Sequence, residues 1–108
     1  MQDTATHYWH HWFDTKDNPE GGHSFGLGYA IAWQRGPLGR GAERREPNGA
    51  FVEDVLSAVI DRVESYQRSK FACEENAEAL RCMYAARSAM NRRTRDREAR
   101  NVEGTHAK

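Results

Sequence analysis

A group of arginines near the C-terminus is the feature of this sequence best suited to bind a ligand. Guanidinium groups hold phosphate through paired hydrogen bonds and are always charged in proteins. If the segment is helical, Arg93 and Arg97 share one face and could both reach one diphosphate. The arginines between residues 87 and 100 outnumber the carboxylates there: Arg87, Arg92, Arg93, Arg95, Arg97 and Arg100 against Asp96 and Glu98.

Two plainer interpretations of these arginines stay open at the level of the sequence. Charged runs on helices usually face water, which would leave the arginines without a ligand. Alternatively, Arg93 and Arg97 could form ion pairs with Glu64 or Glu98 across a pair of helices.

The helical spacing extends upstream of the arginines. Such periodicity predicts a long helix with one continuous face. The macrodipole of this helix favours positive side chains at its C-terminal end. The face begins with an amide, passes through a packing zone and ends in guanidinium: Asn76, Leu80, Met83, Met90, Thr94 and Arg97.

Other kinds of site are not indicated. His7, His10 and His11 are close in sequence, but on a strand His10 and His11 point to opposite faces, and no adjacent cysteine or carboxylate completes a zinc site. The serines of the C-terminal half do not lie in a nucleophile elbow. Gly26 and Gly28 lie inside an expected strand rather than before a helix, so they do not form a phosphate loop. We expect no catalytic residue, no metal and no cofactor.

Two helices are needed to position the ligand-binding side chains. Residues 67–70 form a loop short enough to make the helices antiparallel, so residues 49–101 are expected to form a helical hairpin. Residues 102–108 form a tail that is ordered only if it docks. Asn48 is a possible N-cap of the first helix, whose apolar stripe is Val52, Val55, Leu56, Val59, Ile60, Val63 and Tyr66.

The first 34 residues predict an antiparallel β-hairpin. Residues 7–13 read as an aromatic strand, and residues 14–23 have the composition of a turn. Residues 24–34 alternate between bulky and small side chains, which predicts one strand with a bulky face and a nearly bare face that includes Gly28. Glycine inside a strand marks a close approach of another backbone or a ligand, so we expect the bare face to make such a contact.

Residues 35–48 form a loop rich in glycine, proline and arginine. We expect Trp33, Arg35 and Arg40 to form the rim of a binding pocket or a second site. The formal net charge of zero argues against a general nucleic-acid coat protein. With no apolar signal segment and no run able to span a bilayer, the chain reads as soluble and cytosolic, with Cys73 and Cys82 reduced and in the core.

Four stretches carry a resemblance to a known family: QRGPL, NGAFVEDVLSAVIDRVESYQ, FACEENAEAL and RRTRDREARNVEGTH. Together they resemble the phage Thoeris anti-defence family of the first type, whose helical hairpin is shared with anti-CBASS sponges. The resemblance covers about residues 33 to 106, and its most specific part is the pairing of FACEENAEAL with RTRDREARNVEGT. Asn101 stands where the family has glycine, and asparagine also tolerates the left-handed conformation. The loop 35–48 is longer and more basic than in the family.

The resemblance implies a protein that binds and sequesters cyclic nucleotide immune signals without cleaving them. The implied ligand is glycocyclic ADP-ribose, held between paired subunits in the cytoplasm of the infected bacterium; some members form hexamers and also hold cyclic di- or trinucleotides. By position in the motifs, Asn76, Arg93 and Arg97 correspond to residues that contact the ligand. Tyr66 stands where the family has phenylalanine, and its ring can stack on adenine.

The sequence therefore predicts an α+β protein with a single domain over residues 1–108. An N-terminal antiparallel β-hairpin, residues 1–34, is expected to pack on a C-terminal antiparallel two-helix hairpin, residues 49–101, and to form at least a dimer because so short a chain buries a modest core. The alternative function is that of a small nucleic-acid-binding regulator whose arginines hold DNA or RNA phosphates. An enzyme that degrades the signal is the third possibility.

Overall fold

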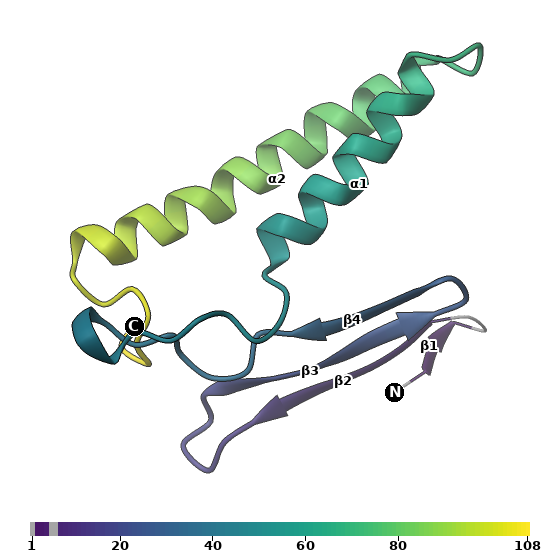
Figure 1. Ribbon diagram of the computed structural model, residues 1–108. Helices are drawn as coiled ribbons and strands as arrows, with labels where there is room; N and C mark the ends of the chain where they lie inside the picture. The colour runs from purple at the N-terminus through teal and green to yellow at the C-terminus, as the bar shows by residue number, and fades with distance from the viewer. Residues whose placement is uncertain (1, 5–6) are drawn as a thin grey trace. The chain divides into compact units, whose positions relative to one another are not determined.

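The computed structural model describes residues 2–4 and 7–108, with only the backbone of residues 2–4, and its fold is α+β as expected (Figure 1). Internal contacts divide the chain into two compact units, Met1–Phe51 with Val102–Lys108 and Val52–Asn101, here named the sheet unit and the helical unit. The expected single domain, packing of sheet on helices and oligomeric state stay predictions. The described elements are β1 (Gln2–Thr4), β2 (His7–Phe13), β3 (Pro19–Gly26), β4 (Tyr29–Trp33), the 3-10 helix η1 (Gly41–Glu43), α1 (Val52–Gln67) and α2 (Glu74–Ala99).

The sheet unit contains a four-stranded antiparallel sheet in the order β1-β2-β3-β4, rather than the expected two-stranded hairpin. Along β2 and β3, Tyr8 lies opposite Phe25 and His10 lies opposite His23. This register puts Tyr8 and His10 on one face of β2 and Trp9 on the other.

The prediction of one strand over residues 24–34 is wrong, because the chain reverses at Leu27 and Gly28. Gly26 pairs with Tyr29 across this two-residue loop, and Leu27 is 91% exposed. The reversal exchanges the faces, so that Phe25 lies opposite Ala30 and shares its face. The expected bare face therefore does not exist, and a Cβ built on Gly28, at φ +86°, would meet nothing within 4 Å.

The turn before β3 is shorter than predicted, because residues 19–23 already belong to the strand. The backbone amide of Asp14 donates to the carbonyl of Asn18, which closes the turn. At Gly22, with φ +132°, β2 and β3 come so close that a Cβ would lie 2.1 Å from the carbonyl oxygen of His10. Only glycine fits here, both for this space and for this backbone conformation.

Two amide side chains close the base of the loop at residues 35–48. The Gln34 side-chain oxygen accepts from the Asn48 backbone at 2.9 Å, and the Asn48 side-chain oxygen accepts from the Arg35 backbone at 2.8 Å. Ala50 then pairs with the end of β4. Asn48 is thus not the N-cap that the sequence suggested, since α1 begins only at Val52 and the Asn48 side chain ties the loop.

The segment after α2 docks on this loop. The Gly39 amide donates to the Gly104 carbonyl at 2.7 Å, and Arg44 donates to both carboxylate oxygens of Glu103 at 2.6 and 3.0 Å. Asn101 has φ 60°, which confirms the left-handed conformation expected for it. The tail is therefore ordered by docking, and the sheet unit is completed by residues that follow the helical unit.

The helical unit is an antiparallel hairpin of α1 and α2, joined by residues 68–73 (Figure 1). Ile60 is its one fully buried side chain, at 1% exposure. The packing zone predicted for the middle of this face of α2 is confirmed, and the half-buried stripe also includes Asn76 and Arg97 at its two ends. Cys73 and Cys82 are free and exposed, so their expected place in the core is wrong. Neither described helix is long and apolar enough to cross a membrane.

Candidate functional site

The looped end of the helical hairpin carries two of the predicted ligand residues. Tyr66, near the end of α1, is 41% exposed, and the Arg62 guanidinium lies 5.4 Å from the centre of its ring. Asn76, in the first turn of α2, donates its side-chain amide to the Phe71 carbonyl at 3.3 Å. Gln67 and Cys73 exchange two hydrogen bonds across the loop, which hold this end of the hairpin together. The ring of Tyr66 and the side-chain oxygen of Asn76 therefore lie on an ordered segment.

The opposite end of α2 carries the other two predicted residues. Arg93 is exposed, whereas Arg97 lies half-buried on the covered stripe. The nearby carboxylate of Asp96 is engaged by Arg100 at 2.9 Å. Among the described residues, Arg93 makes no ion pair with Glu64 or Glu98. The Arg93 side chain therefore keeps its charge available for an anionic ligand.

One chain does not bring the four predicted residues together. Asn76 and Arg93 are 17 positions apart in one continuous α-helix, which separates them by about 25 Å at ~1.5 Å per residue. The tip pair of Tyr66 and Asn76 and the basic pair of Arg93 and Arg97 therefore lie far apart in a single protomer.

Arg87 has a structural role that the sequence did not separate from the other arginines. Its guanidinium donates to the Ser57 hydroxyl at 3.0 Å and lies 5.3 Å from the centre of the Tyr84 ring. It is half-buried on the covered face of α2, between Met83 and Met90. Its position on the apolar stripe is the signal that could have identified it as a link between α1 and α2.

The three residues expected at a pocket rim are used in different ways. Trp33 donates its indole N–H to the Ser24 hydroxyl at 2.9 Å, which makes it part of the sheet. Arg40 donates to the Glu103 carbonyl at 2.8 Å and so holds the tail. The guanidinium of Arg35 lies 5.6 Å from the centre of the Trp12 ring. The rim role of these residues stays a prediction, and only Arg35 lines the neighbouring groove.

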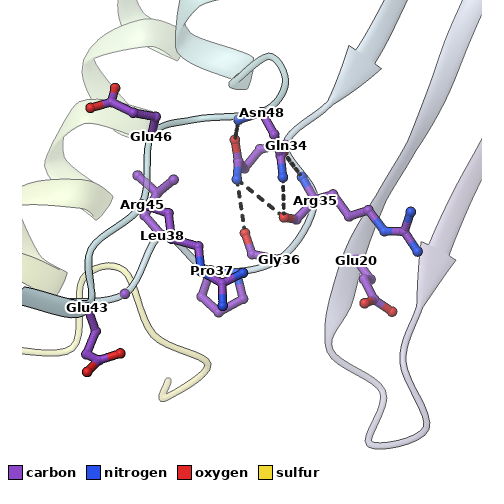
Figure 2. Close-up of a pocket in the computed structure, with 11 residues that line it drawn as sticks. Glu20, Gln34, Arg35, Gly36, Pro37, Leu38, Glu43, Arg45, Glu46 and Asn48 are labelled. Atoms are coloured by element: carbon purple, nitrogen blue, oxygen red, sulfur yellow. Dashed lines mark hydrogen bonds between the residues drawn. The ribbon is translucent and has the colours of Figure 1, made fainter.

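This groove, of about 490 Å³, lies along the loop of the sheet unit (Figure 2). Arg45 is a second cation in its wall, which the sequence prediction missed. The carboxylates of Glu20, Glu43 and Glu46 also line the groove, so the cations do not make it a purely anion-binding site. No group of three or more metal-binding side chains occurs in the described part of the chain.

Comparison with known proteins places the chain in a family. No protein-family model matches the sequence. The chain is 46% identical over 78 residues to Thoeris anti-defense 1 of Bacillus phage SBSphiJ7, an alignment that covers 72% of this chain and 52% of that protein. The chain thus spans about half the length of this curated relative. On this identity, the chain belongs to the Thoeris anti-defence 1 family.

Proposed function

We propose that this protein acts for a phage against the Thoeris defence, in the cytoplasm of the infected bacterium, by binding a cyclic nucleotide signal and holding it uncleaved. The observation that carries the proposal is the 46% identity with a protein named Thoeris anti-defense 1. The exposed Arg93 and the ring of Tyr66 support it, because phosphate capture and base stacking need these groups. Glycocyclic ADP-ribose contains both an adenine and a diphosphate.

The ligand is held between two copies of the chain. The tip pair and the basic pair of one protomer are about 25 Å apart along α2, too far for one cyclic ADP-ribose to contact both. If two helical units lie side by side and antiparallel, the tip pair of one protomer meets the basic pair of its partner. Tyr66 then stacks on the adenine, Asn76 hydrogen-bonds the ligand, and Arg93 and Arg97 hold its phosphates.

An apolar row on α1 supports the pairing of two chains. Val52, Val59 and Tyr66 recur every seven residues and are 44%, 45% and 41% exposed. A seven-residue repeat keeps side chains on one side of a helix, as in coiled-coil seams. The row belongs to the predicted apolar stripe, yet α2 leaves it open. A second copy would cover it and enlarge a core in which, among the described residues, Ile60 alone is fully buried.

The energies required of the four residues are attainable in a rigid site. Sequestration at nanomolar affinity corresponds to about 12 kcal/mol. A hydrogen bond to a charged group contributes about 1.5–3 kcal/mol, and a base stacked on an aromatic ring about 1–3 kcal/mol. Several such contacts reach the required affinity only if the side chains of the site are already ordered before the ligand binds. Residues on helices meet this condition.

The decisive experiment identifies the ligand directly. The full-length protein is incubated with glycocyclic ADP-ribose, its isomers, and cyclic di- and trinucleotides, then washed, heat-denatured and analysed by mass spectrometry. We expect intact glycocyclic ADP-ribose to be released. Release of a cleaved product would identify an enzyme instead. Retention of no cyclic nucleotide, together with oligonucleotide binding that weakens steeply with salt, would support the nucleic-acid alternative.

The proposed pairing is tested by sedimentation. Val59→Asp places a charge in the apolar row and is expected to shift the protein toward monomer and to weaken signal retention in parallel. Glu53→Asp, a change outside the row, is the control and should sediment like the parent. Parent protein that is monomeric both with and without the signal would contradict the shared site.

A further inference from the structure

Aromatic rings stand side by side across the strands on one face of the sheet. Tyr8 lies opposite Phe25, and Phe25 lies opposite Ala30. The Tyr8 and Phe25 rings are stacked, with centroids 5.3 Å apart and planes 15° from parallel. Side chains of one cross-strand row lie on the same face of an antiparallel sheet. The stack therefore runs from β2 to β3 and stops at β4, where Ala30 provides only a methyl group.

A trough of about 240 Å³ lies beside the stacked rings, where β4 would carry a third one. Its walls include His23, Phe25, Ala30 and Ala32. Neighbouring strands are about 4.8 Å apart, close to the separation of the two stacked rings. A flat group placed over Ala30 would therefore continue the stack, with Phe25 beside it and the alanine methyl groups beneath it.

The chemistry around the trough favours a flat group joined to an anion. Among the described residues where β2, β3 and β4 are paired in register, this face carries no carboxylate. His10 and His23 lie opposite each other in the next row, about 7 Å along the strands from Phe25. A neutral imidazole has one N–H donor and a protonated one has two. Both side chains are exposed and can donate to a phosphate.

We propose that this trough binds the purine base of a free nucleotide, with the base against Phe25 and the phosphate near His10 and His23. Every nucleobase can stack in this way because each has a π-face. The trough is smaller than the roughly 300–1,000 Å³ of pockets that enclose larger ligands, so it takes one base rather than a whole cyclic dinucleotide. It uses no residue of the helical unit and does not depend on the proposed sequestration.

The test follows the methyl signals of Ala30 and Ala32 by NMR in the full-length protein while AMP is added to millimolar concentrations. We expect saturable shifts of both signals, with weaker binding of adenosine, which lacks the phosphate, and of ribose 5-phosphate, which lacks the base. Ribose 5-phosphate binding as tightly as AMP would overturn the proposal, as would the absence of saturable shifts at these two methyl groups.

Filling the trough provides the matched variant. Ala30→Phe adds the third ring, and aromatic cross-strand pairs stabilise sheets, so the variant should fold and still lose at least tenfold in AMP affinity, followed at Ala32. Leu27→Phe adds the same ring in the exposed loop between β3 and β4 and should bind AMP like the parent. Unchanged AMP affinity of Ala30→Phe would overturn the proposal. A changed oligomeric state of Ala30→Phe, with no response of the parent to AMP, would instead identify the trough as a contact between copies.

Discussion

The sheet unit depends on backbone segments that approach each other closely, whereas the helical unit depends on the packing of its side chains. In the sheet unit, Gly22, Gly49 and Gly104 each face a backbone atom closer than a Cβ can approach, at 2.1, 2.6 and 2.4 Å. In the helical unit, by contrast, Ile60 is the fully buried side chain and the covered stripes are half-buried. We therefore expect the sheet unit to be most sensitive to atoms added at these three glycines, and the helical unit to atoms removed from its buried side chains.

The largest effect is expected from Gly22→Ala. The new methyl group would clash with the His10 carbonyl and occupy a backbone conformation that is strained for any other residue. We expect a loss of more than about 3 kcal/mol in the free energy of unfolding, measured by urea denaturation. In Gly28→Ala the new methyl group would meet nothing within 4 Å. This variant should lose only about 1–2 kcal/mol in the free energy of unfolding, because the left-handed backbone conformation is strained for alanine. Equal losses in the two variants would remove the contrast between crowded and open glycines.

The helical unit should respond most to Ile60→Ala. Removing a fully buried aliphatic side chain leaves a cavity, and the expected loss is about 3 kcal/mol. Ile60→Val, which removes one methyl group, should cost about 1 kcal/mol in the same denaturation experiment. If both variants lose the same amount, the packing around Ile60 is not what stabilises the hairpin.

Substitutions of the arginines at the end of α2 should weaken ligand binding with little loss of folding stability. Arg93→Ala and Arg97→Ala are each expected to weaken binding of glycocyclic ADP-ribose at least tenfold, about 1.4 kcal/mol. The exposed Arg93 should contribute little to stability. Calorimetry measures the affinity, with Arg95→Ala, two positions from both arginines and on another side of α2, as the matched control. Parent-like binding by both variants would place the signal site elsewhere.

The Tyr66 ring should matter more than its hydroxyl. The hydroxyl accepts from the Arg62 guanidinium at 3.3 Å on an exposed surface, which is a weak contact. Tyr66→Phe is therefore expected to bind the signal like the parent, whereas Tyr66→Ala should weaken it by about tenfold because the stack is lost. A large loss with Tyr66→Phe would show that the hydroxyl, not the ring, contacts the ligand.

The ion pair that holds the tail should contribute a smaller amount to stability. Arg44 and Glu103 form a two-contact pair, but their side chains are 43% and 19% exposed, so solvent screening limits the gain. Glu103→Gln should lower the free energy of unfolding by about 1 kcal/mol. Asp96→Asn, which breaks the more exposed pair with Arg100, should cost less than half of this. Similar losses in the two variants would show that the second hydrogen bond between Arg44 and Glu103 adds no stability.

The smallest effect is expected from pH at the turn before β3. Hydrogen bonds from the backbone and then the side chain of Asn18, with a further one from the Lys16 amide, hold the pKa of Asp14 below its usual 3.8. Because the folded-state pKa is the lower one, the stabilisation is complete above the unfolded pKa and is lost as the pH falls through the folded value. Asp14→Asn should therefore flatten the acid side of the stability profile. An unchanged profile would mean that this turn does not contribute.

The helical unit could largely be predicted from the sequence, whereas the sheet could be predicted only in part. The periodicity of α2 identified its covered face correctly because a long helix repeats one pattern over many turns. The alternation of bulky and small residues did not predict the loop at Leu27 and Gly28, because the pattern continues unchanged through the point where the chain reverses. The glycines on either side of Leu27 were the available signal, since short hairpin loops favour glycine.

The candidate site could be predicted as residue types but not as an arrangement. The motifs indicated Tyr66, Asn76, Arg93 and Arg97, and helix geometry then separates them into two ends of one hairpin. The roles of Arg40 and Arg44 could not be predicted, because their partner Glu103 follows the whole helical unit in the sequence. Contacts between distant segments leave no periodic pattern in the chain.

The docking of the tail also sets an order of events during synthesis. The loop at residues 35–48 emerges from the ribosome early, but its contacts with Glu103 and Gly104 need residues that are made some 60 positions later. The helical unit needs only its own local contacts, and local contacts form fast. The middle of the chain can therefore fold while the sheet unit, although begun first, is still waiting for its final segment.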